Sequence, residues 1–303
     1  MIPTLDASAL ARGDRDSMQT MADAVRDVGF LLLAGTPVTP AQVTQVIDVY
    51  RGFFAQSNTA KAKVDMARTG GNRGWGAPRS EQVDPGSKPD FKEVFDSGFE
   101  LPPGDPMAER GLAVYAPNLW PDVPAFQATI EAYAAAAMSV ATEMLRAIAV
   151  AIGAPASHFD QAFERPMALL RGNYYPARPT SAGVSDFGIA PHTDYGCLTL
   201  LATDGQPGLD VQLQDGSWMP VIAPPGTFVI NFGEMLEIWT RGGVRATPHR
   251  VIGGAGERLS VPLFFNPSYD TDIAPPGSPT PMLAGPYLEN RYRGTYVHLK
   301  TQA

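Results

Sequence analysis

The chain has 303 residues, of which 44% are hydrophobic and 18% are charged, and this balance predicts a folded globular protein. The formal net charge of −8 disfavours nucleic acid or an anionic membrane surface as a partner, because both attract basic proteins. The single cysteine, Cys197, excludes an intrachain disulfide and a zinc site built from several cysteines.

The N-terminal segment has no basic region followed by an apolar core, so no signal peptide is expected. No uninterrupted apolar run approaches the roughly 18 residues that cross a bilayer. We therefore expect a cytoplasmic protein without a membrane partner. The composition leaves the oligomeric state open.

The first third of the chain predicts mixed α and β structure. An apolar stripe at helical spacing covers residues 14–28, and Gly29 is placed to end that helix. Residues 30–33 form a short apolar run that indicates a buried strand. Residues 39–42 resemble a capping box with proline at the first helical position, so a second helix should follow.

The middle of the chain divides into a loop-rich segment and a long helix. Residues 68–124 are rich in glycine, proline and charge, and we expect loops and short turns that cover a site. Residues 124–152 carry apolar side chains at helical spacing, and Gly153 and Pro155 should end this helix.

After residue 165 the pattern changes to short β-type runs separated by turn residues. Asp204-Gly205 and Asp215-Gly216 are two of these turns. Closely spaced strands without intervening helices favour an antiparallel jelly roll over βαβ units. The expected fold is therefore mainly β with flanking helices, and residues 283–297 predict a last helix that packs back on the body.

Two of the four histidines fall in the β-rich half together with a carboxylate. His192 and Asp194 are two residues apart at a predicted strand end, so their side chains can point to the same side. His249 lies on a later predicted strand. Two imidazoles and one carboxylate on one face of a metal leave about three positions open, as in non-haem Fe(II) oxygenases, although zinc accepts the same ligands.

A second group of polar residues suits an anionic co-substrate beside such a metal. Arg258 and Ser260 alternate on one strand, so a guanidinium and a hydroxyl can clamp one carboxylate. Asn173 and Tyr175 alternate on an earlier predicted strand and could close the same pocket.

At this point the sequence resembles the 2-oxoglutarate- and Fe(II)-dependent oxygenases of the isopenicillin N synthase type, in their bacterial form. The motifs that carry the resemblance occur in order along most of the chain: Asp90–Glu93, Asn118–Pro121, Asn173–Pro176, Pro191–Asp194, Val229–Glu237, Pro248–Val251, Arg258–Ser260, Phe265–Pro267 and Tyr287–Tyr292.

The resemblance implies a double-stranded β-helix (jelly roll) core. It implies an N-terminal mixed α/β region over residues 1–120 and a jelly-roll domain over residues 121–303, in one compact unit. It also implies that His192, Asp194 and His249 bind Fe(II), that Arg258 and Ser260 bind the distal carboxylate of 2-oxoglutarate, and that Asn173 and Tyr175 contact this co-substrate.

The implied activity is that of an oxidoreductase, a 2-oxoglutarate-dependent dioxygenase. It would use O₂ to hydroxylate, desaturate or cyclise a small organic molecule, with release of succinate and CO₂. No catalytic residue beyond the metal ligands is assigned.

Three other interpretations remain open at the level of sequence. A sibling enzyme, similar to isopenicillin N synthase or aminocyclopropane carboxylate oxidase, would keep the metal without using 2-oxoglutarate. A jelly roll can also be a non-catalytic module that binds a small acid. A zinc hydrolase would need a base such as Glu234 or Glu237.

The substrate is the least determined feature. A small, partly apolar molecule would suit aromatic side chains near the metal. The residues that could bind it are Arg73, Trp75, Phe91, Trp239 and Phe265, with Lys92 and the segment 282–292 as further candidates. Each of these side chains could equally serve core packing.

Overall fold

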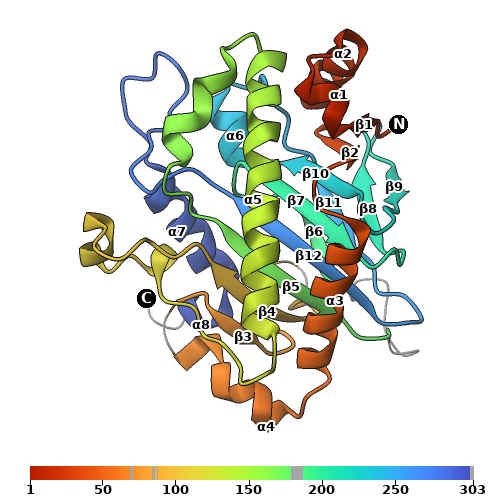
Figure 1. Ribbon diagram of the computed structural model, residues 1–303, viewed down its shortest axis with the longest axis vertical. Coiled ribbons are helices and arrows are strands. Elements are labelled where there is room, and N and C mark those ends of the chain that lie inside the picture. The colour runs from red at the N-terminus through yellow and green to blue at the C-terminus, as the bar shows by residue number, and fades with distance from the viewer. Residues whose placement is uncertain (69–70, 84–85, 87, 179–186, 301–303) are drawn as a thin grey trace.

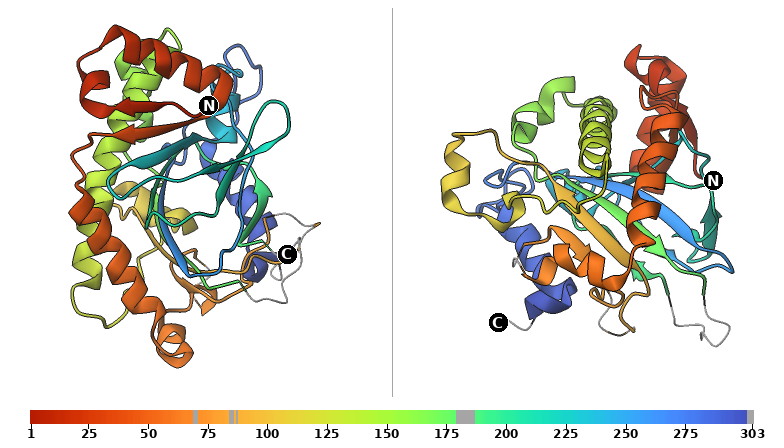
Figure 2. Two further views of the ribbon diagram at one scale, coloured as in Figure 1. Left: turned by 90° about the vertical axis from the view of Figure 1, so that its right-hand side faces the viewer. Right: turned by 60° about the horizontal axis from the view of Figure 1, so that its bottom comes forward.

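A computed structural model describes residues 1–68, 71–83, 86, 88–178 and 187–300 (Figure 1). Over these residues the strands form two sheets that curve toward each other (Figure 2). The larger sheet consists, in spatial order, of β1 (Thr4–Asp6), β2 (Phe30–Ala34), β10 (Phe228–Phe232), β7 (Leu198–Thr203), β12 (Arg258–Phe265), β5 (Leu169–Tyr175), β4 (Glu93–Gly98) and β3 (Gly74–Gly76). The smaller sheet consists of β6 (Ile189–His192), β11 (His249–Val251), β8 (Leu209–Gln212) and β9 (Trp218–Val221).

The pairing is almost entirely antiparallel, with β1 and β2 as the parallel exception among the described strands. The predicted turn at Asp215-Gly216 lies between β8 and β9, which pair with each other in antiparallel register. The larger sheet takes strands from both sides of residue 120. These features confirm a mainly β jelly roll with flanking helices.

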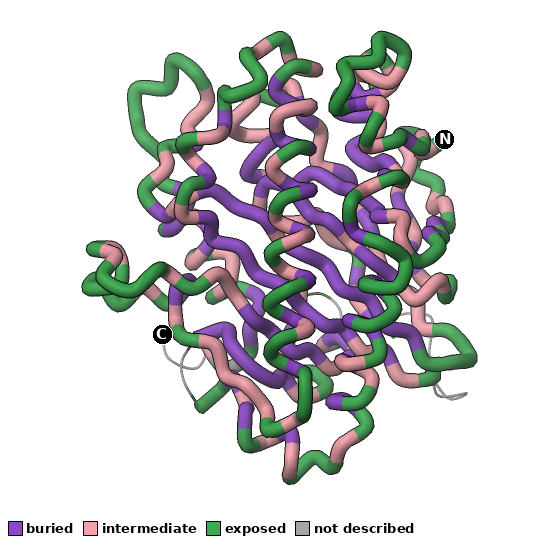
Figure 3. The backbone as a smooth tube through the Cα atoms, viewed as in Figure 1, coloured by how far each residue is buried: buried purple, intermediate pink, exposed green. Residues whose placement is uncertain are grey.

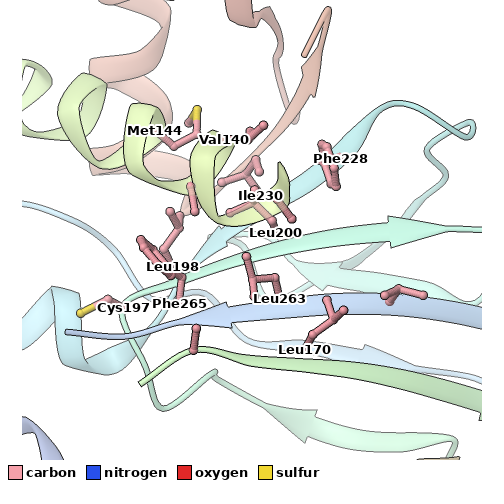
Figure 4. Close-up of a cluster of buried hydrophobic side chains, with 14 of the residues drawn as sticks. Val140, Met144, Leu170, Cys197, Leu198, Leu200, Phe228, Ile230, Leu263 and Phe265 are labelled. Carbon is pink, nitrogen blue, oxygen red and sulfur yellow. The ribbon is translucent and has the colours of Figure 1, made fainter. Parts of the chain in front are cut away.

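Two helices, α3 (Pro40–Phe54) and α5 (Phe126–Ala151), lie across one face of the larger sheet (Figure 1). The predicted capping box starts α3: the Gln42 amide N donates to Thr39 Oγ1 at 3.3 Å, and the Thr39 amide N donates to Gln42 Oε1 at 2.9 Å. Figure 4 shows Val140 and Met144 of α5 above Leu200 and Ile230 of the sheet. This contact is the main hydrophobic core.

By length and composition α5 could span a membrane, which was not expected from the sequence. Its buried positions repeat at helical spacing and belong to the hydrophobic core, while the opposite side is exposed (Figure 3). This one-sided burial is typical of an amphipathic helix on a core.

The remaining helices are short and lie mostly at the periphery. They are α1 (Ala7–Ala11), α2 (Arg15–Asp23), α4 (Asn58–Lys61), α6 (Glu234–Trp239), α7 (Ala284–Thr295) and α8 (Val297–Lys300). Short stretches of 3₁₀ helix occupy Ala62–Val64, Met66–Arg68, Pro106–Arg110, Ala113–Tyr115 and Ala156–Phe163. The helix predicted over 14–28 is α2, continued by a π-helical turn at Ala24–Val28 that ends at Gly29 with φ 73°.

The prediction of loops and turns over residues 68–124 was wrong for two segments, because β3 and β4 are strands of the larger sheet. The strand β4 is largely buried although its sequence contains charge. Asp96 of β4 is fully buried and accepts two hydrogen bonds at 2.7 Å from Arg171 of the neighbouring β5. Because the buried Asp96 is charged, the sequence of β4 lacks the run of apolar residues that would identify a buried strand.

Candidate metal centre and substrate pocket

Three side chains with metal-binding chemistry converge where the smaller sheet meets the larger one. His192 ends β6 and His249 begins β11, and the two residues are direct partners in the antiparallel register. Asp194 follows two residues after His192. The ligand atoms of all three lie within 4.8 Å of one another, with Asp194 Oδ1 at 3.7 Å from His192 Nε2 and 3.6 Å from His249 Nε2.

Hydrogen bonds from the surrounding backbone orient the imidazoles. His192 Nδ1 lies 2.8 Å from the Ala190 carbonyl oxygen, and His249 Nδ1 lies 3.3 Å from that of Thr247. Because a carbonyl oxygen only accepts hydrogen bonds, each Nδ1 carries the proton, and each Nε2 keeps its lone pair for a metal.

Hydrogen bonds also orient the Asp194 carboxylate. Asp194 Oδ2 accepts hydrogen bonds from Thr199 Oγ1 at 2.5 Å and from Asn231 Nδ2 at 2.7 Å. Sequence reasoning missed both donors, although each lies on a predicted strand. They leave Asp194 Oδ1 as the oxygen that faces the two imidazoles.

The local electrostatics favour the ligand forms of these groups. Burial, reinforced by the nearby His249, lowers the pKa of His192 to about 3, so its imidazole is neutral at pH 7. Burial alone would raise the pKa of Asp194, but the two imidazoles and the two hydrogen bonds outweigh it and lower this pKa. A neutral imidazole and an ionised carboxylate are the metal-binding forms.

The predicted carboxylate clamp lies on the adjoining strands of the larger sheet. Arg258 and Ser260 of β12 pair in register with Tyr175 and Asn173 of β5, so the four side chains share one face. The Arg258 guanidinium lies 5.1 Å from the Tyr175 ring centroid, and the two residues are 4% and 2% exposed.

Several polar atoms of this clamp lack a partner among the described residues: Arg258 Nε and Nη1, and Asn173 Oδ1. A buried, unpartnered guanidinium indicates a site for an anion. Together with two imidazoles and a carboxylate, the chemistry of these residues fits Fe(II) and a carboxylate-bearing co-substrate such as 2-oxoglutarate.

A pocket of about 640 Å³ of empty space, its open mouth included, lies beside these residues. His192, Asp194 and Asn173 line one side of it.

Part of the pocket wall is a buried network of charges that sequence reasoning missed, apart from naming Lys92. Arg171 donates to Asp96 and lies 2.7 Å from Glu81, and Lys92 lies 2.7 Å from Glu81 and 3.3 Å from Asp90. Burial alone would raise the pKa of Glu81, but Arg171 and Lys92 lower it to about 2. Burial raises the pKa of Asp90 to about 6. The cations of this wall are therefore neutralised within the protein.

The C-terminal helix α7 covers the same pocket. Leu288, Tyr292 and Thr295 line it, within and just beyond the candidate segment 282–292. Glu234, at the start of α6, accepts hydrogen bonds from Thr193 and from Arg291 of α7. The residue between His192 and Asp194 is thus connected to the helix that covers the pocket.

The five substrate-binding candidates from the sequence do not line this pocket. Trp75 is buried and donates to Glu93, and Trp239 and Phe265 pack on Phe159 and Phe163 in the core. Phe91 is half-buried. Arg73 lines a second, neighbouring cavity.

The carboxylates considered as hydrolytic bases are engaged in structural contacts. Glu234 accepts from Thr193, Tyr287 and Arg291, and Glu237 Oε1 accepts from the Ala246 amide N at 3.1 Å. Neither residue belongs to the metal-binding group of the described residues. This arrangement gives no support to a zinc hydrolase.

The chain matches two family models. Residues 2–123 match the family described as non-haem dioxygenase in morphine synthesis N-terminal, and residues 166–267 match the 2OG-Fe(II) oxygenase superfamily.

The chain is also similar to curated and structurally characterised proteins. It is 31% identical to a 2-oxoglutarate-Fe(II) type oxidoreductase of Aspergillus fumigatus, over 88% of this chain and 83% of the relative. It is 32% identical to a homoarginine-6-hydroxylase of Oryza sativa, over 90% of this chain and 88% of the relative. A full-length Neurospora crassa protein, crystallised in complex with alpha-KG and thymine, is 27% identical, with a TM-score of 0.84 over 100% of this chain and 97% of that one.

These similarities agree with the fold and with the donor set, and they favour an enzyme that uses 2-oxoglutarate over the sibling oxidases. Fe(II) is its metal, 2-oxoglutarate and O₂ are its co-substrates, and a small molecule is its substrate. The chain therefore belongs to the 2-oxoglutarate- and Fe(II)-dependent oxygenase superfamily, in its isopenicillin N synthase-like branch.

Proposed function

We propose that His192, Asp194 and His249 hold the Fe(II) of this oxygenase, and that Arg258 and Ser260 hold the distal carboxylate of 2-oxoglutarate. The observation that carries the assignment is the convergence of three ligand atoms within 4.8 Å, next to an unpartnered, buried guanidinium. Asn173 and Tyr175, opposite the clamp in the register, complete the co-substrate site.

Iron held by His192, Asp194 and His249 would supply the chemistry that couples oxidative decarboxylation of 2-oxoglutarate, with release of succinate and CO₂, to oxidation of the substrate by O₂. The chain's own residues supply position and environment. Thr199 and Asn231 fix Asp194, and the backbone carbonyls fix the imidazoles. The helix α7 and the buried walls limit access of water to the reacting atoms.

We further propose that the protein hydroxylates a small organic molecule bound in the pocket that His192 and Asp194 line. The name of the rice relative and the thymine bound to the Neurospora crassa protein both support small substrates that carry polar groups. The ion-paired network of Lys92 and Arg171 with Glu81, Asp90 and Asp96 offers hydrogen-bonding groups without a net excess of cations. This wall therefore suits an uncharged part of the substrate, namely the part with the C–H bond that is oxidised.

The test is a substrate screen read out by succinate release and O₂ uptake, with and without added 2-oxoglutarate. We expect turnover that requires both Fe(II) and 2-oxoglutarate, with one succinate formed per product. Substrate oxidation without 2-oxoglutarate would favour the sibling oxidases. Failure of the chain to bind either Fe(II) or 2-oxoglutarate would contradict the assignment of the site.

A further inference from the structure

A second cavity lies next to the pocket beside the metal-binding residues. It encloses about 810 Å³ of empty space, its open mouth included. Leu169, Leu288 and Tyr292 line both cavities, so these three side chains form the partition between them. A substrate that extends past this partition would reach from one cavity into the other.

Arg73 is the buried cation of this second cavity. Its side chain is 3% exposed, and its guanidinium donates to two backbone carbonyl oxygens, that of Asn72 at 2.8 Å and that of Val114 at 2.6 Å. Among the residues that the structure describes, Arg73 Nε has no hydrogen-bond partner, and neither has the buried Asn72 Oδ1. Within the described part of the chain, no carboxylate lies within 4 Å of this guanidinium.

The charge of Arg73 is therefore not neutralised as that of Arg171 is. Asp96 acts on Arg73 only at longer range and is already bound by Arg171 through both oxygens. Burial lowers the pKa of Arg73, and the distant carboxylates offset this only in part. Arg293 and Glu289, which also line the cavity, face each other at 3.9 Å and largely cancel.

The guanidinium is held in place by the sheet edge. A Cβ atom at Gly98 would lie 2.1 Å from Arg73 Nη2 and 2.3 Å from Cζ, so the guanidinium rests directly on the Gly98 backbone. Asn118 in turn fixes Gly98, because it accepts from the Gly98 amide N at 2.7 Å and donates to the Gly98 carbonyl oxygen at 2.9 Å. An anion would thus meet an ordered donor, which lowers the entropic cost of binding.

We propose that Arg73 forms an anion subsite that binds the carboxylate of a small organic acid, whose oxidisable part lies across the partition in the pocket beside the metal. This inference rests on the proposed function and adds a substrate class to it. A planar guanidinium fork matches a carboxylate, and a buried cation without an internal counter-ion gains most from one. The unpartnered Asn72 Oδ1 can accept from a hydroxyl or amino group near the carboxylate.

The test measures binding without turnover, in the full chain loaded with Fe(II) and saturating 2-oxoglutarate and kept anaerobic. Under these conditions 2-oxoglutarate occupies the clamp at Arg258, so a second carboxylate must bind elsewhere. The probes are matched pairs of carboxylic acids and their primary amides, from butanoate to octanoate and 3-phenylpropanoate, with inorganic phosphate as a further arm. Isothermal titration calorimetry gives each affinity.

We expect at least one acid to bind about ten- to a hundredfold tighter than its amide, as the loss of one charge-assisted contact implies. Arg73→Gln should abolish this preference. Arg293→Gln removes a cation from the rim of the same cavity and should change the preference less than about threefold. Gly98→Ala keeps Arg73 in the sequence, but the added Cβ atom would displace its guanidinium. This variant should therefore weaken acid binding, and it provides a second test if Arg73→Gln fails to fold.

Several results would overturn the proposal: equal affinities for acid and amide, a preference that survives Arg73→Gln, binding of phosphate alone, or no binding by any acid. A separate titration of 2-oxoglutarate in the same protein tests the proposed function. Normal 2-oxoglutarate binding with no acid preference would reject the Arg73 subsite while leaving the oxygenase assignment intact.

Discussion

Replacement of Arg258 by methionine should make the protein more stable without co-substrate and less able to bind it. Arg258 is 4% exposed, and two of its guanidinium nitrogens have no partner among the described residues. Exchange of a buried charged group for an apolar side chain of similar volume is often neutral or stabilises by about 1–4 kcal/mol. At about 2–4 °C per kcal/mol, a gain of about 1–4 kcal/mol raises the melting temperature by roughly 2–16 °C.

The same substitution removes the charged partner of the 2-oxoglutarate carboxylate. The loss of a charge-assisted hydrogen bond costs about 1.5–3 kcal/mol, which weakens 2-oxoglutarate binding roughly ten- to a hundredfold. At a concentration of 100 times the wild-type Kd, the wild type gains about 2.7 kcal/mol from the ligand. A variant with a hundredfold weaker site gains only about 0.4 kcal/mol under these conditions.

The assay is chemical unfolding of the Fe(II)-loaded, anaerobic protein as a function of 2-oxoglutarate concentration. The stabilities of Arg258→Met and wild type should approach or cross as 2-oxoglutarate increases. Arg171→Met is the matched control, because Arg171 is equally buried but fully paired with Asp96 and Glu81. It should destabilise by about 3–5 kcal/mol, since it leaves buried carboxylates unpaired. A destabilised Arg258→Met with normal 2-oxoglutarate affinity would refute the reasoning.

Three further predictions concern the metal ligands and the buried charges. His249→Ala should abolish Fe(II) binding in equilibrium dialysis, whereas the control His158→Ala should retain it; retention by both would remove His249 from the metal site. Asn231→Ala removes a hydrogen bond to Asp194 and should raise the Kd for Fe(II) about ten- to a hundredfold, and an unchanged Kd would count against this orienting role. Asp90→Asn tests a pH effect: its folded pKa of about 6 exceeds the ordinary 3.8, so the folded wild type holds a proton that the unfolded chain releases between these values. The free energy of unfolding of the wild type should thus decrease relative to that of the variant as the pH rises from 3.8 to about 6, by up to about 3 kcal/mol. Urea unfolding at a series of pH values measures this difference. A difference that does not change with pH would contradict the prediction.

The sequence predicted those parts of the fold that have a clear helical periodicity or are bounded by turn residues. The long helix over 124–152 is α5, and most of the strands after residue 165 lie where the short β-type runs between turn residues indicated. The strand β4 was missed because Asp96 is buried against Arg171, so its pattern resembles that of an exposed segment. The short helix α6 was not predicted, because its 6 residues are too few for a helical periodicity to be visible.

The residues of the site that could be predicted are likewise those that show a pattern within a short stretch of sequence. His192 and Asp194 are neighbours in sequence, and their strand spacing alone suggested that they act together. The charged wall of the pocket could not be found in this way, because Arg171 and Glu81 are 90 residues apart and Glu81 lies outside the named strands, in an isolated bridge to Tyr296. The alternation of Arg171 with Asn173 on β5 was the one available sign that Arg171 faces the same side.

The division of the centre between two sheets has a consequence for how the protein unfolds. His192 and His249 belong to the smaller sheet, whereas Arg258 and Ser260 belong to the larger one. A local unfolding event that separates the two sheets would therefore separate the iron ligands from the co-substrate clamp. Bound Fe(II) and 2-oxoglutarate should in turn link the two sheets of the jelly roll. Occupancy should accordingly suppress hydrogen exchange in β6 and β11 further than the apolar contacts of Ile189 and Val251 already do.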